Sequence, residues 1–166
     1  MEFKNIDVLR ALGIKGLRRV ADLQKSACAE VPNVKGIYVV ARTAKTPPVF
    51  IPKSCGGHFK KKDPTVSILE LQENWVENSI VLYIGKAGGS NSNATLRKRL
   101  WQYMQFGAGK PIGHWGGRYI WQLKDSSDLL VGWKAFDHEE PSDVEGDLIA
   151  KFVSVFGKRP FANLKD

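Results

Sequence analysis

The residues best suited to chemistry in this chain are a tyrosine, a lysine and an arginine in its middle part. Tyr83 lies in a short apolar run, Lys86 follows it closely, and Arg99 comes after a stretch rich in glycine and asparagine. The segment from Asn78 to Lys124, which contains all three, has no aspartate or glutamate but several lysines and arginines. A phenol beside such a concentration of positive charge indicates chemistry at a phosphate group.

Hydrolysis of a phosphodiester needs an activated water, neutralisation of the charge on the phosphate oxygens, and assistance to the leaving oxygen. Arg99 could hold the phosphate through two parallel hydrogen bonds, which a lysine cannot copy. The alternative is a solvated cation on a helix surface. That alternative is weaker for Arg99 than for its neighbours, because Arg99 lies next to Leu96 and Leu100 on the predicted helix.

The elements that must position these residues are a strand, a turn and a basic helix. The apolar run from Ile80 that ends at Gly85 predicts a buried strand. Turn-forming residues from Gly88 to Asn93 predict a loop, and a helix should begin near Ala94 or Thr95. In that helix Arg99 and Tyr103 are one turn apart and share a face.

Two tripeptides identify what this arrangement resembles. Gly36-Ile37-Tyr38 precedes the strand, turn and helix, and Tyr83-Ile84-Gly85 lies within the predicted strand. The pair resembles the signature of the GIY-YIG nuclease superfamily, which includes homing endonucleases, restriction enzymes and the incision domain of a bacterial excision-repair subunit. Downstream residues match the family in its order: Lys86, Arg99, Tyr103, Glu145 and Asn163. The long connection from about Thr43 to Ser79 departs from the family and is interpreted as an insertion.

The resemblance implies a role for each matched residue. Glu145 would bind Mg²⁺ or Mn²⁺, and Tyr38 or Tyr83 would activate the water. Tyr83 is favoured because Lys86 is close in sequence, and a phenol needs cationic neighbours to ionise near neutral pH. Tyr103 and Asn163 would be supporting hydrogen-bond partners. One matched carboxylate implies hydrolysis with a single metal ion.

Glu145 also has a structural interpretation. Ser142 and Glu145 have the spacing of a capping box, in which the glutamate side chain bonds back to the start of its own helix. Against this, Glu145 precedes Ile149, Phe152 and Phe156 on the buried stripe of the predicted helix, so its side chain should face the sheet.

Further basic residues could contact the nucleic acid outside the reaction centre. The loop from Lys53 to Pro64 is rich in lysine, and it could cover a bound phosphodiester or be an ordinary solvated loop. His114 lies beside Trp115 in the sequence, although a loop histidine is more often simply solvated. The predicted nucleic-acid-binding residues are Lys60, Lys61, Lys62, Arg97, Lys98, His114 and Arg118.

The fold predicted for the whole chain, 1–166, is a single α+β domain with a small, mostly antiparallel sheet of three or four strands flanked by helices. We expect strands over 36–42, the run from Ile80, 114–123 and 129–136, with a hairpin turn at Ser126 and Ser127. Helices are expected over 6–25, within a helical extension of 1–35, and over 63–78 and 143–156. The insertion spans 43–79.

Composition narrows the function classes. The net charge of +8 and the pI near 9.5 favour a polyanionic partner. We expect no membrane association, since no apolar run is long enough to span a bilayer and the chain start lacks an apolar signal core. The two cysteines are too few for a disulfide framework, which favours a cytoplasmic location.

These observations predict a metal-dependent DNA endonuclease, with RNA as a further possible substrate. The alternative within the same fold is a catalytically inert module that only binds nucleic acid. A small-molecule enzyme or a protein-interaction domain fits less well with the segregation of charge along the chain. A monomer with one site would nick DNA, whereas a symmetric dimer could cut both strands.

Overall fold

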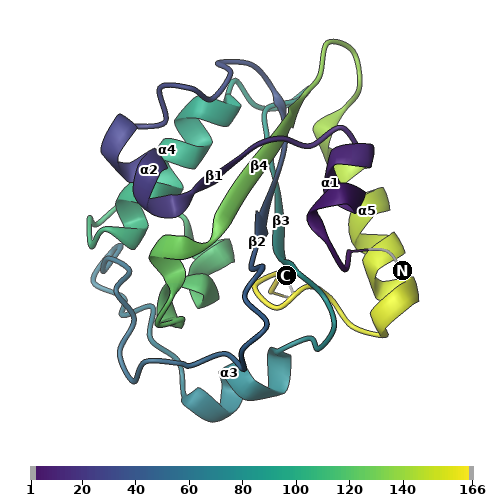
Figure 1. The fold of residues 1–166 in the computed structure, drawn as a ribbon. Helices are drawn as coiled ribbons and strands as arrows, with labels where there is room; N and C mark the ends of the chain where they lie inside the picture. The colour runs from purple at the N-terminus through teal and green to yellow at the C-terminus, as the bar shows by residue number, and fades with distance from the viewer. Residues whose placement is uncertain (1–2, 165–166) are drawn as a thin grey trace.

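A computed structural model describes residues 3–164 of the chain and shows an α+β fold built on one antiparallel sheet (Figure 1). The ends of the predicted domain, residues 1–2 and 165–166, lie outside the described residues. The strands are β1 (Lys15–Arg19), β2 (Gly36–Ala41), β3 (Val81–Ala87) and β4 (Leu130–Ala135), in the order β1-β4-β2-β3. All three pairings are antiparallel, which confirms the predicted fold class and leaves β1 and β3 as the edge strands.

Helices cover both faces of the sheet (Figure 1). On one face lie α2 (Val20–Ser26), α4 (Leu96–Gly107) and the 3-10 helix η1 (Trp115–Gln122), followed by the short η2 (Ser126–Asp128). On the other face lie α1 (Ile6–Ala11) and α5 (Pro141–Phe156). The sheet therefore separates two hydrophobic clusters, and α3 (Ile68–Asn74) lies at one end of the molecule.

The central strand β2 is buried along its whole length and connects the two clusters. Because side chains alternate along a strand, Tyr38 and Val40 enter the cluster beneath α4, while Ile37 and Val39 enter the cluster beneath α5. In the pairing with β3, Tyr38 lies opposite Gly85. The signature tripeptides are thus neighbours in space.

The elements around the predicted reaction centre form as expected. The helix after the glycine-rich loop is α4, and its N-cap is Thr95, whose hydroxyl accepts a hydrogen bond from the Lys98 amide. The last helix, α5, begins two residues before the expected start because Pro141 occupies its first turn. It ends at Gly157, which has a φ of 77° at the C-cap.

The strand predicted for 114–123 is wrong, and so is the hairpin predicted around Ser126 and Ser127. These residues form η1 and η2, and β4 pairs with β1 and β2. The close approach of the Tyr103 side chain to the backbone of Gly117 explains the difference. The Tyr103 hydroxyl donates to the Gly117 carbonyl at 2.6 Å, and a Cβ at Gly117 would lie 2.3 Å from that hydroxyl. The paired glycines therefore bring this segment onto α4.

The prediction of helices alone in the first 35 residues is also wrong, because β1 lies between α1 and α2. Gly13 and Gly16, which look like interruptions of a helix, have φ values of 87° and 82°. A Cβ at Gly16 would lie 2.4 Å from the Trp133 ring, so this glycine allows β1 to pack against β4. Leu17 adopts a φ of 53° at a bulge in this pairing.

The long connection between β2 and β3 contains less regular structure than predicted. The helix expected over 63–78 is limited to α3, with Ser67 as its N-cap. Outside α3, Phe50 makes an isolated bridge with Leu123. The buried Gln122 side chain fixes the connection by bonding to backbone groups of Ile51 and Val66.

Candidate active site

A pocket of about 380 Å³ lies beside the edge strand β3, where the first turns of α4 and α5 approach it. It brings together five of the predicted reaction-centre residues from four elements. β2 contributes Tyr38, β3 contributes Tyr83 and Lys86, α4 contributes Arg99, and α5 contributes Glu145. The remaining lining residues are Ala87, Gly88, Ser92, Ala94 and Gln102.

Gly85 explains how Tyr38 reaches this edge. Tyr38 belongs to β2, so its ring must pass over β3 to line the pocket. A Cβ built at Gly85 would lie 2.3 Å from Tyr38 Cζ and 2.5 Å from its hydroxyl oxygen. The second glycine of the signature therefore provides the space that the first tyrosine occupies.

Replacing Gly85 by alanine is expected to displace the Tyr38 ring and to lower the free energy of unfolding by about 1–3 kcal/mol, the usual cost of overpacking. Urea denaturation measures this change. The control is Gly146→Ala in α5, where a Cβ meets nothing within 4 Å and where alanine is the better helix former. Equal stability changes in the two variants would contradict the argument.

Two contacts fix the start of α5 against the end of β3. The Lys86 amine donates to the Ser142 hydroxyl at 2.7 Å, and the Glu140 carboxylate accepts from the hydroxyl of Ser90 at 2.6 Å. The N-cap of α5 is Glu140, so Ser142 lies inside the helix and not at the cap position that a capping box requires. Glu145, one turn further, is half-buried and lines the pocket.

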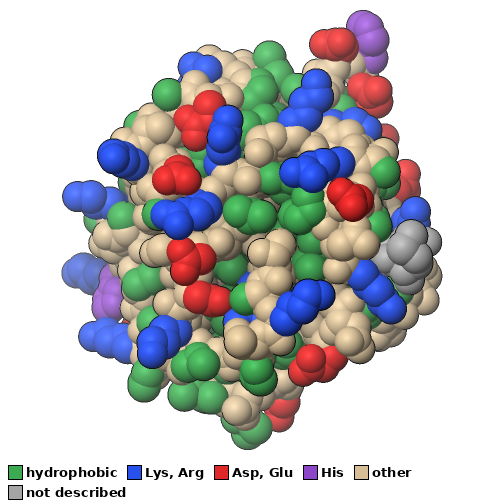
Figure 2. All heavy atoms as spheres, viewed as in Figure 1, with side chains coloured by type: hydrophobic (Ala, Val, Ile, Leu, Met, Phe, Trp, Pro, Cys, Tyr) green, Lys and Arg blue, Asp and Glu red, His purple; other side chains and the backbone are tan. Residues whose placement is uncertain are grey.

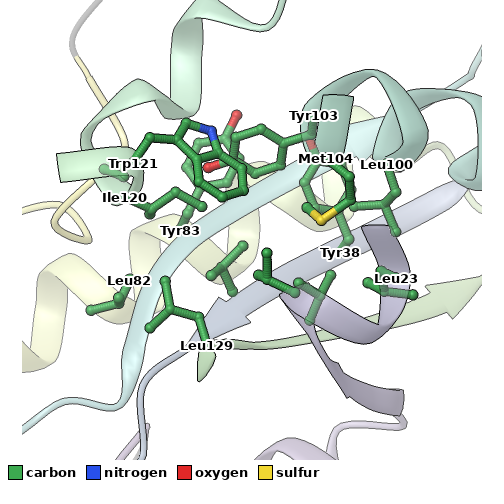
Figure 3. Close-up of a cluster of buried hydrophobic side chains, with 14 of the residues drawn as sticks. Leu23, Tyr38, Leu82, Tyr83, Leu100, Tyr103, Met104, Ile120, Trp121 and Leu129 are labelled. Atoms are coloured by element: carbon green, nitrogen blue, oxygen red, sulfur yellow. The ribbon is translucent and has the colours of Figure 1, made fainter. Parts of the chain in front are cut away.

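Behind the pocket lies an aromatic cluster (Figure 3). The rings of Tyr38 and Tyr83 have centroids 5.9 Å apart, and those of Tyr83 and Tyr103 are 5.6 Å apart. His114 stacks on Tyr103 with centroids at 3.8 Å and shares a 2.8 Å hydrogen bond with the Tyr38 hydroxyl through Nε2. The sequence suggested that His114 contacts substrate, but its side chain is buried beneath the tyrosines.

Burial dominates the ionisation of these tyrosines. It raises the pKa of Tyr38 and Tyr103 well above the usual value and also raises the pKa of Tyr83, although Arg99 acts in the opposite direction on all three. The hydrogen bond between the hydroxyls raises the pKa of Tyr38 and lowers that of Tyr83. Tyr83 is therefore the easier of the pair to ionise, but the lowering expected from Lys86 is not found.

His114 should make stability depend on pH. Burial, assisted by Arg99, holds its pKa well below the ordinary 6.5, so the folded protein keeps the ring neutral. Below pH 6.5 the unfolded chain binds a proton that the folded chain does not. The free energy of unfolding should therefore fall by about 1.4 kcal/mol per pH unit as the pH decreases from 6.5.

Denaturation at pH 7.5, 6.5 and 5.5 measures this dependence. The His114→Asn variant should lose the slope between pH 6.5 and 5.5, while His138→Asn, a change at an exposed histidine, should keep it. An unchanged slope in His114→Asn would assign the pH dependence to other groups.

Asn163 and Tyr103 support the site from outside the pocket. The Asn163 carbonyl oxygen accepts from the Ile84 amide at 2.9 Å, and its amide nitrogen donates to the Ile84 carbonyl at 2.9 Å. This side chain thus pairs the free edge of β3 between Tyr83 and Gly85, as a neighbouring strand would. Tyr103 instead anchors η1 through the bond to Gly117. Both residues position other groups.

The remaining predicted nucleic-acid contacts lie outside the pocket. Arg97 is exposed, with its Nε donating to the Val31 carbonyl at 2.8 Å, and Lys98 is exposed on the same helix. Lys60–Lys62 belong to the segment over 53–64, where basic side chains gather at the left edge of the face in Figure 2. Arg118 lines a different pocket.

Sequence reasoning missed the residues that connect the parts of the site. The role of Glu140 and Ser142 in joining α5 to β3 has no local signal, because their partners lie 50 and 56 positions away. His114 also gave no sign of burial, since the glycines around it are typical of a loop. Among residues 3–164, no group of three or more His, Cys, Asp or Glu side chains is arranged to hold a metal ion.

Within the described part of the chain, none of the helices combines the length and apolar character needed to cross a membrane. Comparisons of the chain with protein-family models, curated proteins and solved structures found no match.

Proposed function

We propose that this protein is a metal-dependent endonuclease that hydrolyses phosphodiester bonds in DNA. The observation that carries the proposal is the convergence of two phenols, an amine, a guanidinium and a carboxylate in one pocket. These groups come from residues as far apart in sequence as Tyr38 and Glu145, and they match the requirements of phosphodiester hydrolysis. The resemblance of the two tripeptides to the GIY-YIG signature supports the same reaction.

Binding of the scissile phosphate falls to Arg99 and Lys86. The Arg99 guanidinium is half-buried on the first turn of α4 and can offer two parallel donors to the phosphate oxygens. Lys86 is exposed at the end of β3, and its bond to Ser142 holds the amine at the same pocket. Together the two cations neutralise the charge that grows on the oxygens in the transition state.

Activation of the attacking water falls to Tyr83. Tyr83 lines the pocket, and its pKa is the less strongly raised of the two pocket tyrosines. Tyr38 supports it from behind, with its own hydroxyl connected to His114 Nε2. In this arrangement Tyr83 would first lose its own proton to solvent, and the phenolate oxygen, stabilised by Arg99, would then accept the proton of the attacking water.

The donor set fits a magnesium or manganese ion. Glu145 is the only acidic side chain among the described residues that line the pocket. A single carboxylate suits Mg²⁺, which keeps several waters and takes its other ligands from substrate phosphate. When bound to Glu145, the ion would supply positive charge to the phosphate and to the leaving oxygen.

One observation favours the inert binding module as the second candidate. Burial raises the pKa of all three tyrosines of the cluster, which opposes ionisation near neutral pH. Such a module would bind DNA with a strong salt dependence and leave it intact, whether or not Glu145 is present.

Incubation of purified protein with supercoiled plasmid, in Mg²⁺ and in EDTA, separates the two candidates. The proposal expects nicked or linear products with Mg²⁺ alone, and nicks without linear product would indicate one site acting on one strand at a time. A single-stranded RNA in a parallel reaction tests the other nucleic acid. Intact plasmid with Mg²⁺ and Mn²⁺, together with tight DNA binding, would leave the inert module as the function.

A further inference from the structure

A second, basic pocket of about 550 Å³ lies on the side of the molecule where the chain leaves α5. Its cations are Arg118 of η1 and the consecutive Lys158 and Arg159 that follow α5. None of the described residues that line it is acidic; the others are Asn74, Tyr119, Val153, Gly157, Pro160, Asn163 and Leu164. The candidate active site uses none of these cations.

Arg118 is held in place before any ligand arrives. Its guanidinium lies 4.8 Å from the centroid of the Trp115 ring and 5.6 Å from that of Tyr119, and its NH1 donates to the Trp115 carbonyl at 3.2 Å. Its Nε is buried and has no hydrogen-bond partner among the described residues. A fixed, partly dehydrated cation binds an anion with little further loss of conformational freedom.

Lys158 and Arg159 are placed by bonds to the backbone, and neither forms an ion pair with another residue of 3–164. The Lys158 amine donates to the Glu73 carbonyl oxygen of the backbone at 3.2 Å, and Arg159 NH1 donates to the Leu164 carbonyl at 2.8 Å. Glu70 is the acid that acts on Arg118 electrostatically, and the Tyr119 hydroxyl donates to its carboxylate. Among the described residues, the side chains that line the pocket therefore carry an excess of positive charge.

The two pockets share the free edge of β3. Asn163 lines the basic pocket and bonds to both backbone groups of Ile84, while the flanking Tyr83 and the nearby Lys86 line the active site. The C-terminal segment lies beside β3 in Figure 1. Glu145 lines the active site and Val153 lines the basic pocket, eight residues apart on α5, which is about 12 Å at 1.5 Å per residue. Successive phosphates of one DNA strand advance about 3.4 Å along the duplex axis, so a few of them cover that distance.

We propose that the basic pocket binds a backbone phosphate of the same nucleic-acid strand, a few nucleotides from the phosphate that Arg99 holds. This inference rests on the proposed function. It adds a second phosphate-binding site to that of Arg99, so that the two sites form a track for one nucleic-acid strand along β3. The track would orient the strand across the active site, because two fixed phosphates define its direction while one does not.

The test compares two double variants that remove the same charge from opposite edges of the sheet. Lys158→Gln with Arg159→Gln removes two cations beside β3. Lys15→Gln with Arg18→Gln removes two exposed cations from β1, the other edge strand. Binding of a short DNA duplex in EDTA is measured over a range of salt concentrations, and thermal unfolding checks that each protein is folded. If the first double variant is unstable, Lys158→Gln alone, a change at an exposed side chain, replaces it in the binding measurement.

The expected result is about tenfold weaker affinity for the variant beside β3, with the slope of log K against log salt reduced by about 0.9 for each phosphate that is no longer neutralised. The β1 variant should stay within about twofold of the unmodified protein. Equal changes in both variants, or none in either, would overturn the inference. If the unmodified protein cuts no DNA but the selective weakening appears, the nuclease proposal fails while the phosphate pocket stands.

Discussion

Replacement of Arg99 by lysine is expected to reduce the rate of DNA cleavage by about a thousandfold. An arginine that stabilises the transition state of phosphoryl transfer contributes on the order of 10³ to 10⁵ in rate. Lysine keeps the positive charge but cannot present two parallel donors to one phosphate. Single-turnover cleavage of a short duplex, with protein in excess, measures the chemical step directly.

Arg18→Lys provides the matched control, because Arg18 is an exposed arginine on β1, at the opposite edge of the sheet. Its cleavage rate should equal that of the unmodified protein. If the cleavage rate of Arg99→Lys falls by tenfold or less, Arg99 contributes only its charge. The proposal that it binds the phosphate through two parallel hydrogen bonds would then be wrong.

The second large effect is expected for Glu145→Gln. Loss of the carboxylate removes the protein ligand proposed for the metal ion, which supplies several kcal/mol of charge stabilisation in reactions of this kind. That energy corresponds to roughly a thousandfold in rate. Cleavage is measured over a Mg²⁺ titration, because a weakened metal site also shifts the concentration needed for half-maximal rate.

Asp147→Asn in the same helix controls for the change of charge, since Asp147 is exposed and lies two residues further along α5. DNA binding in EDTA should be retained by both variants. Full activity of Glu145→Gln, at every Mg²⁺ concentration, would exclude this carboxylate as the metal ligand and favour a purely structural role in α5.

The sequence predicts those parts of the fold that depend on residues close together in the chain. The buried strands β2 and β3, and the helix that Thr95 caps, all follow from apolar runs and turn residues close to them. Residue chemistry and the resemblance of the two tripeptides indicate the five pocket residues, and the structure places these residues together.

The parts that could not be predicted depend on distant partners. The edge strand β1 has a mostly exposed, irregular burial pattern, so its residues do not alternate as those of a strand do. Its one glycine, Gly16, makes room for the ring of Trp133, far along the chain. The sequence of 115–122 predicts a strand because its aromatic residues favour strands. The segment instead forms a 3-10 helix, and the hydrogen bond from Tyr103 to Gly117 fixes this conformation.

The bonds from Asn163 to Ile84 have a consequence for how the protein is made. Partners 79 positions apart are joined only after nearly all of the described chain exists. Because synthesis runs from the N-terminus, a nascent chain that stops short of Asn163 has both signature tripeptides but lacks the side chain that bonds to the outer edge of β3. The edge of β3 beside the candidate active site is therefore completed late in folding, after the sheet strands themselves have been made.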